Sequence, residues 1–122
     1  MHGYSSVVMH VMIKAVQRGV RFNVIVTEGG GSGSGSSSQS VKETLEQSNI
    51  PTKLIQNAAV ATVMSKVDCI FVGCEAVLEN GGIVNKVGTF TVALCAKTFQ
   101  KPFYVFTEPL KFMKEFPLQF VR

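Results

Sequence analysis

The apolar residues of the chain gather in four short runs that contain many β-branched and aromatic side chains. Across these runs most positions are apolar, whereas a strand with one solvated face alternates apolar and polar positions. Such runs are typical of strands that are buried on both faces of a parallel sheet. The pattern therefore predicts four buried strands, at residues 22–27, 52–55, 69–73 and 103–107.

Segments with a helical spacing of apolar residues lie before and between these runs. Ser5 and Ser6 are suitable N-caps for a first helix, which is expected to end at Gly19. Helices that alternate with buried strands indicate an α/β fold, in which right-handed crossovers place the helices against a parallel sheet. The further helices are predicted at residues 41–48, 58–66 and 89–99.

Two segments depart from this alternation. The chain opens with MHGYSS, so no strand precedes the first helix, although a doubly wound fold normally enters that helix from a strand. Residues 29–40, GGGSGSGSSSQS, are rich in Gly and Ser and stand where a loop of about two to six residues is usual. We predict a flexible loop at residues 29–40, and the sequence leaves open whether it is a native insert, an engineered linker or a mobile lid.

The length and composition indicate one globular domain that spans residues 1–122. The chain has no apolar run near the ~18 residues of a membrane span and no signal-peptide pattern. The formal net charge is +4, and the Lys and Arg residues are dispersed, so we expect no direct contact with nucleic acid. These features favour a cytoplasmic protein that does not associate with membranes.

The three cysteines of the chain do not form a recognisable framework. Cys69, Cys74 and Cys95 are odd in number and lack the spacing of metal ligands, which argues against disulfides and zinc. Cys69 and Cys95 lie in apolar runs and are expected to be buried. No histidine lies near Cys74 in the sequence, so we expect a structural role for it and not a nucleophile. We expect a reducing compartment, no metal and no cofactor.

Polar residues follow the predicted strands at their carboxyl ends. Glu28 follows the first strand, Asn57 the second, Glu75 the third and Glu108 the fourth. Ligands of open α/β sheets bind in the crevice at this end, so these side chains are expected to face one crevice. Glu75 could act there as a general acid or base, or accept hydrogen bonds from loop amides. His2 could face the same crevice, although a histidine near a terminus is usually solvated.

The stretch ENGGIVNKVGTF, residues 79–90, has the physical properties of an anion-binding loop. Gly81, Gly82 and Gly88 allow close approach of the backbone and exposed N–H groups, and Lys86 adds a positive charge. The helix that follows offers its N-terminus to negative charge. The loop matches neither GxxxxGK[ST] nor GxGxxG, which leaves nucleotide binding unsupported. Two interpretations remain: a site for a small phosphate-bearing ligand, and an ordinary exposed loop.

Five stretches carry a more specific signal: HGYSSVV, FNVIVTE, NAAVATVMSKVD, FVGCEAVLENGGIVNKVGTFTVALCAK and KPFYVFTEPLKFMKEFPL. Together they resemble the alpha, beta and delta regulatory subunits of eukaryotic translation initiation factor 2B, the alpha subunit most of all. That family shares its fold with isomerases of methylthioribose 1-phosphate and ribose 1,5-bisphosphate. The resemblance covers almost all of the chain outside residues 29–40. It implies a Rossmann-like C-terminal domain that is truncated at both ends and lacks its first strand, which should end at His2.

The resemblance also implies a ligand site that has lost its catalytic pair. The isomerases carry a cysteine at the position of Gly3 and aspartates at the positions of Glu75 and Asn57. The positions of Asn85 and Lys86 contact substrate in the isomerases, and both residues are retained here. We therefore expect no catalytic residue, and a sugar-phosphate site built from Asn57, Glu75, Asn85, Lys86 and Gly88.

The function implied by the resemblance is that of a non-catalytic, alpha-like regulatory subunit of the guanine-nucleotide exchange factor for translation initiation factor 2. Such a subunit supports assembly of the complex and senses phosphorylated initiation factor 2. The partners implied are the other initiation factor 2B subunits, initiation factor 2, a second copy in a homodimer and a sugar-phosphate ligand. The alternative is an aldose–ketose isomerase of the methylthioribose 1-phosphate or ribose 1,5-bisphosphate type.

Overall fold

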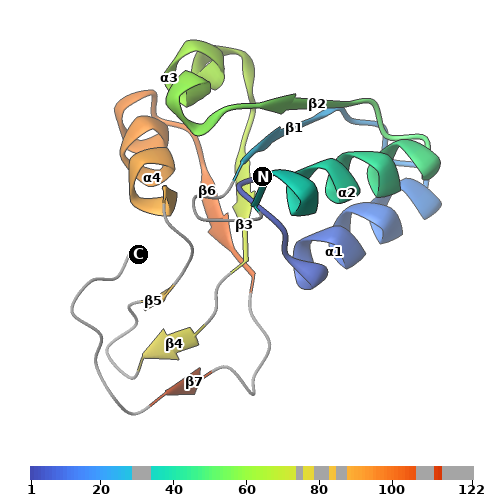
Figure 1. The fold of residues 1–122 in the computed structure, drawn as a ribbon, viewed down its shortest axis with the longest axis horizontal. Helices are drawn as coiled ribbons and strands as arrows, with labels where there is room; N and C mark the ends of the chain where they lie inside the picture. Colours follow the sequence, from blue (N-terminus) through green and yellow to red (C-terminus); the bar gives the residue numbers. More distant parts are fainter. Residues whose placement is uncertain (29–33, 74–75, 79–82, 85–87, 107–111, 114–122) are drawn as a thin grey trace.

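Four short parallel strands form two separate pairs in the computed structural model of the protein (Figure 1). β1 (Val24–Thr27) pairs with β2 (Thr52–Ile55), and β3 (Ile70–Val72) pairs with β6 (Phe103–Val105). The positions of the four predicted strands are therefore confirmed, but their predicted burial is wrong for β2 and β6, which contain no buried residue. Within the described part of the chain the four strands do not join into one sheet. The structure describes residues 1–28, 34–73, 76–78, 83–84, 88–106 and 112–113.

The first pair of strands shares a core with two helices. α1 (Ser6–Gln17) and α2 (Ser34–Gln47) lie side by side along β1 and β2 (Figure 1). The predicted cap of α1 is confirmed, because the Ser5 Oγ accepts a hydrogen bond from the Val8 N–H at 3.3 Å. The buried residues of this core are Val8, Met9, Met12, Val24, Val26, Val41, Leu45 and Ile50.

The second pair of strands has a core of its own. The segment between β2 and β3 is one α-helical turn, α3 (Val60–Val63), between the 3₁₀ turns η1 (Asn57–Ala59) and η2 (Met64–Lys66). It packs against α4 (Thr89–Thr98), which also contacts β6. The core buries Val60, Met64, Ile70, Val72, Val92 and Ala96. No helix in the part of the chain that the structure describes could cross a bilayer.

α2 begins at Ser34, earlier than the predicted start at residue 41. The prediction of a flexible loop over residues 29–40 is therefore wrong for 34–40, and residues 29–33 lie outside the described residues. Ser38, Val41 and Leu45 are buried and follow each other at helical spacing, so they form one inward face. Relative to alanine, each serine lowers the stability of a helix by only about 0.5 kcal/mol. Packing of the buried face outweighs that cost.

A further small sheet was missed by the sequence patterns. β4 (Ala76–Leu78) pairs antiparallel with β5 (Ile83–Val84) and parallel with β7 (Phe112–Met113). The loop expected after the third strand is therefore interrupted by β5. Strands of two or three residues are too short to show a periodicity, which explains why no pattern predicted them.

The first three residues of the chain pair with the carboxyl end of β1. The Thr27 N–H donates to the Met1 carbonyl at 2.9 Å, and the Gly3 N–H donates to the Thr27 carbonyl at 2.8 Å. These bonds form a parallel bridge between His2 and Thr27. The Met1 α-amine donates to the Ile25 carbonyl at 2.8 Å. A bridge thus lies where the family resemblance expects a strand to end.

The buried Met1 amine predicts a dependence of stability on pH. Desolvation lowers the pKa of this amine from 8.0 to about 6, and the neighbouring Cys69 opposes the shift. The unfolded chain therefore binds more protons than the folded chain between these values, so stability should rise from about pH 6 to about pH 8. Two pKa units correspond to about 2–3 kcal/mol in the free energy of unfolding.

Urea unfolding across this pH range measures the effect, and acetylation of the Met1 amine is the control. The acetylated chain should lack this component of the pH dependence, because it has no amine to titrate. Identical pH profiles for the free and acetylated chains would show that the amine is not desolvated in the folded state.

Candidate functional site

Two of the five ligand residues expected from the sequence, Asn57 and Gly88, lie next to each other. A Cβ atom on Gly88 would overlap the Asn57 Nδ2, so the two residues meet only because Gly88 has no side chain. Asn57 follows β2 and opens η1, while Gly88 is the N-cap of α4. Glu75, Asn85 and Lys86 lie outside the described residues.

His2 and Thr27 complete a buried polar cluster with these two residues. The His2 Nδ1 lies 2.7 Å from the Thr27 Oγ1, and the side chain of His2 is only 3% exposed. The His2 Cε1 lies 2.9 Å from the position of a Cβ on Gly88. Of the two positions considered for His2, solvated or facing the crevice, the solvated one is therefore wrong. We call His2, Thr27, Asn57 and Gly88 the polar cluster.

The polar cluster lies where the strand-end rule places a ligand. Thr27 is the last residue of β1, and Asn57 follows the end of β2. Sequence patterns could find Asn57 by its position after a strand. They named His2 as one that could face the crevice but could not show its burial, which depends on pairing with a residue 25 positions away. They missed Thr27, because it is the last residue of a predicted strand.

The amide oxygen of Asn57 has an unmet hydrogen-bonding capacity. The Asn57 Oδ1 is buried, and the structure gives it no hydrogen-bond partner among the described residues. An unpaired buried acceptor costs about 1–3 kcal/mol, which a donor from a ligand or a neighbouring group offsets. A hydroxyl group is one such donor. This atom therefore makes the polar cluster a candidate binding site.

The N-terminus of α4 adds a preference for negative charge to the same place. Gly88 has a left-handed φ of 93° and offers no side-chain cap to the first turn of the helix. The helix dipole favours an anion at such an end. The polar cluster therefore combines an acceptor for hydroxyl groups with a helix end suited to phosphate.

The described residues contain no group of three or more His, Cys, Asp or Glu side chains that could hold a metal ion. Gly3, at the position of the isomerase cysteine in the resemblance, has a left-handed φ of 63°. Glycine adopts that conformation without strain, whereas a cysteine there would be strained.

Comparison with protein families decides the relationship of the chain. The family model described as "Initiation factor 2 subunit family" matches residues 1–121. The chain belongs to this family. Its relatives include the translation initiation factor eIF2B subunit alpha of Dictyostelium discoideum, which is 46% identical over 96% of this chain and 36% of the relative. The chain thus spans about a third of the length of this curated relative.

An enzyme and a solved structure are also similar to this chain. The ribose 1,5-bisphosphate isomerase of Archaeoglobus fulgidus is 38% identical over 91% of this chain and 34% of the enzyme. The crystal structure of the translation initiation factor eIF-2B from Pyrococcus horikoshii superposes with a TM-score of 0.84 at 32% identity. The superposition covers 91% of this chain and 39% of the Pyrococcus horikoshii chain. This similarity confirms the Rossmann-like α/β fold.

Because Gly88 contacts Asn57, we expect a single methyl group at position 88 to lower the free energy of unfolding strongly. Gly88→Ala should lower the free energy of unfolding by about 2–4 kcal/mol, because left-handed strain adds to displacement of the Asn57 amide. Gly19→Ala is the matched control, since Gly19 has a φ of 89° and nothing within 4 Å of a Cβ. It should cost only about 1 kcal/mol.

The double variant Gly88→Ala/Asn57→Ala separates the backbone strain at position 88 from the clash between the new methyl group and the Asn57 amide. It should recover part of the difference between the two glycine variants, measured by urea unfolding, because the amide that meets the new methyl group is gone. Equal losses for Gly88→Ala and Gly19→Ala would show that the close approach to Asn57 does not constrain position 88.

Proposed function

We propose that the protein acts as a non-catalytic, alpha-like regulatory subunit of the cytoplasmic guanine-nucleotide exchange factor for translation initiation factor 2. The observation that carries this proposal is the 46% identity to an eIF2B alpha subunit over 96% of the chain. In this role the protein supports assembly with other initiation factor 2B subunits, pairs with a second copy and senses phosphorylated initiation factor 2. Gly3, in place of the isomerase cysteine, supports a role without catalysis.

The outer face of α4 supports a role in subunit contacts. Val92 and Ala96 point into the second core, whereas Phe90 and Leu94 are 60% and 49% exposed. Phe90 and Leu94 are one helical turn apart, so they form one apolar surface. Large exposed apolar side chains that lie together are typical of surfaces that bind other proteins. We propose that this surface contacts another subunit of the complex.

Removal of the exposed apolar side chains tests the assembly role. Phe90→Ala/Leu94→Ala should reduce capture of the other initiation factor 2B subunits by the protein at least about tenfold, because a few buried apolar anchors dominate interfaces. The free energy of unfolding should change by only about 0.5 kcal/mol, since both side chains are exposed. Co-purification and urea unfolding measure the two effects.

A matched control on the same helix is Thr91→Ala/Lys97→Ala, which changes two exposed polar residues. It should leave capture unchanged. Unchanged capture by Phe90→Ala/Leu94→Ala would remove this face from the interface. Failure of the unaltered protein to bind any initiation factor 2B subunit, or initiation factor 2 in either phosphorylation state, would contradict the regulatory role itself.

We further propose that the region of the polar cluster holds a sugar phosphate, with Asn85, Lys86 and Glu75 as additional ligand residues. The Asn57 Oδ1, which has no hydrogen-bond partner among the described residues, and the dipole of α4 support this proposal. The 38% identity to a ribose 1,5-bisphosphate isomerase supports the class of ligand and also favours isomerisation as a second candidate function. Binding and turnover distinguish the two candidates.

Titration calorimetry with ribose 1,5-bisphosphate and methylthioribose 1-phosphate tests ligand binding, and product analysis tests turnover. We expect binding without turnover. Lys86→Ala should weaken binding about tenfold or more, because a charged hydrogen bond contributes about 1.5–3 kcal/mol. Lys97→Ala, at the far end of α4, is the control and should have no effect. Measurable turnover would establish the isomerase instead, and no binding would leave the subunit without a ligand.

A further inference from the structure

The first half of α2 has a composition that is unusual for a helix. Residues 34–40, SGSSSQS, contain no apolar residue, whereas the second half carries Val41 and Leu45 into the first core. Serine and glycine are poorer helix formers than alanine, because serine competes with the backbone for hydrogen bonds and glycine loses more conformational entropy. We call residues 34–40 the leading segment of α2. Its helical conformation depends on contacts with the rest of the fold.

Two side-chain contacts of the leading segment stabilise it only slightly. Ser38 is buried, with 1% of its surface exposed, but its Oγ has no hydrogen-bond partner among the described residues. A buried hydroxyl without a partner opposes the burial that holds it in place. The Gln39 side-chain amide donates to the Glu43 carboxylate at 3.4 Å, which is a long hydrogen bond exposed to solvent. These two contacts therefore give the leading segment little stability.

A second helix start lies directly at the end of the leading segment. Residues 40–43, SVKE, match the capping-box pattern S-x-x-E. In this pattern the serine hydroxyl accepts a hydrogen bond from the N–H of the glutamate, whose carboxylate accepts one from the N–H of the serine. A helix that began at Val41 would keep Val41 and Leu45 in the first core. α2 thus has two alternative starts, one at Ser34 and one at Val41, where the sequence pattern predicts it.

Phosphate on Ser40 would favour the later start. Within the longer helix Ser40 is an interior position, and the N–H groups of Lys42 and Glu43 are engaged by carbonyls one turn back. At the start of the shorter helix these two N–H groups could bind the phosphate, and the helix dipole favours its negative charge. The phosphate is close to Glu43 in both forms, so that repulsion does not choose between them.

Ser40 is accessible to a protein kinase. Ser40 and Glu43 are both exposed. Kinases select substrates partly by charge pattern, and a carboxylate three residues after the serine suits a kinase whose substrate groove is basic. Within residues 34–48, no other serine or threonine has a carboxylate at this spacing. A kinase also needs its substrate in an extended conformation, which a weakly stabilised helix segment adopts readily.

We propose that Ser40 is a phosphorylation site and that phosphate on Ser40 moves the start of α2 from Ser34 to Val41. The γ-phosphoryl group of ATP is transferred to the Ser40 Oγ, ADP leaves, and the hydroxyl proton passes to the base of the kinase. The leading segment is then released from the helix. This inference goes beyond the proposed function, because it concerns neither subunit contacts at α4 nor the ligand residues of the polar cluster.

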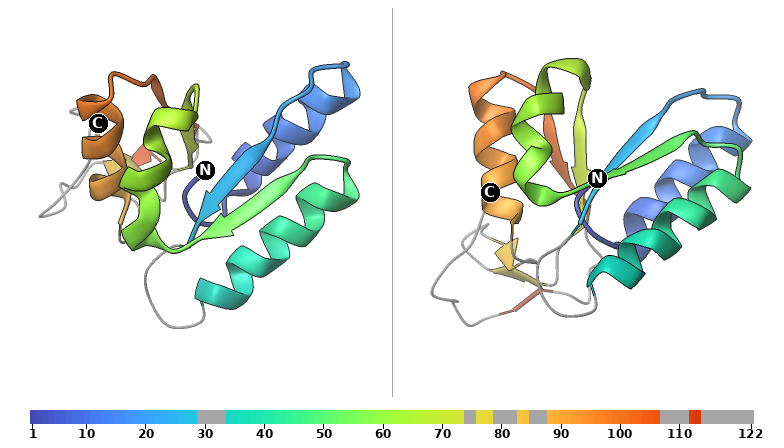
Figure 2. Two further views of the ribbon diagram at one scale, coloured as in Figure 1. Left: turned by 90° about the horizontal axis from the view of Figure 1, so that it is seen from above. Right: turned by 45° about the horizontal axis from the view of Figure 1, so that its top comes forward.

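The position of the leading segment gives this modification a structural consequence. Figure 2 shows the amino end of α2 at the same end of the molecule as the carboxyl ends of β1 and β2. The polar cluster lies at this end too, because Thr27 is the last residue of β1 and Asn57 follows β2. Release of the leading segment therefore changes the conformation of the chain at the end of the molecule that holds the polar cluster.

Amide hydrogen exchange of the full chain with phosphoserine incorporated at position 40 tests the change of start. In the shorter helix the Gln39 and Val41 amides lose their helix hydrogen bonds, so their exchange should accelerate about tenfold or more. The Leu45 amide bonds to the Val41 carbonyl in both forms and should not change. Unchanged exchange at Gln39 and Val41, or equal acceleration at Leu45, would overturn the proposal.

Phosphothreonine at position 44 is the matched control for charge. Thr44 is exposed on the same helix, but a helix that began after it would be shorter than one turn. This control should therefore not accelerate exchange selectively at Gln39 and Val41. If it does, charge alone changes the helix, and the start at Val41 is wrong.

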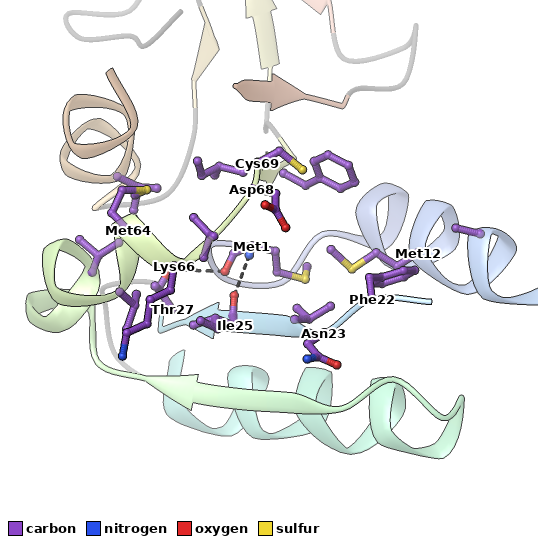
Figure 3. A pocket seen from close by; sticks show the side chains of 18 of the residues that line it. Met1, Met12, Phe22, Asn23, Ile25, Thr27, Met64, Lys66, Asp68 and Cys69 are labelled. Atoms are coloured by element: carbon purple, nitrogen blue, oxygen red, sulfur yellow. Dashed lines mark hydrogen bonds between the residues drawn. The ribbon is translucent and has the colours of Figure 1, made fainter. Parts of the chain in front are cut away.

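Thiol labelling of the full chain measures the release of the leading segment independently. Ser38→Cys should react slowly without phosphate, because Ser38 is buried, and about tenfold faster with phosphoserine at position 40. Gln39→Cys is the control, since Gln39 is already exposed and should react equally in both forms. Cys69 is the internal reference: it was expected to be buried but is exposed, beside a cavity to which no described residue of α2 contributes (Figure 3). Equal rates at position 38 with and without phosphate would contradict the release.

A kinase assay tests the site itself. The full chain is incubated with MgATP and a serine kinase that selects a carboxylate three residues after its target, and mass spectrometry locates the phosphate. Ser65 is exposed and has Asp68 at the same spacing, so the assay uses the Ser65→Ala chain. Phosphate should appear on Ser40, and Glu43→Gln should slow its addition about tenfold. Absence of phosphate on Ser40, or addition that Glu43→Gln does not slow, would refute the assignment.

Discussion

Main-chain pairing between residues 1–3 and Thr27 is the contact on which the polar cluster depends. It places His2 against the end of β1, which brings an imidazole next to Asn57 and Gly88. It also places Met1 between the two strand pairs, where its α-amine donates to the Ile25 carbonyl (Figure 3). A disturbance of these three residues would therefore reach the polar cluster.

Local sequence patterns predicted the features of the fold that depend on interactions between near neighbours in the chain. β2 has the predicted bounds, because the segment TKLI stands between Pro51 and a polar pair. The cap of α1 follows from one serine hydroxyl. α2 is longer than predicted because Ser38 is buried on the same helix face as Val41 and Leu45, and burial depends on the rest of the fold, which composition does not contain.

In the candidate site too, the sequence predicted single residues by local rules but not the contacts between them. The rule that ligands bind at the carboxyl ends of strands found Asn57, and the glycine content of the loop found Gly88. Neither rule could show that the two residues touch, because that contact depends on the path of η1 and the left-handed turn at Gly88. For His2 the sequence left two interpretations, crevice or solvent, because its environment is created by pairing between distant residues, whereas sequence windows compare near neighbours.

The exposed face of α4 has a consequence for the life of the protein in the cell. Phe90 and Leu94 remain accessible to water on a helix that is otherwise anchored in the second core. Accessible apolar groups of this kind are what chaperones and proteolytic surveillance recognise in incompletely assembled proteins. In the role proposed above, a chain that is made in excess of its partner subunits would keep this apolar surface exposed. Its abundance would then follow the supply of the subunits that cover α4.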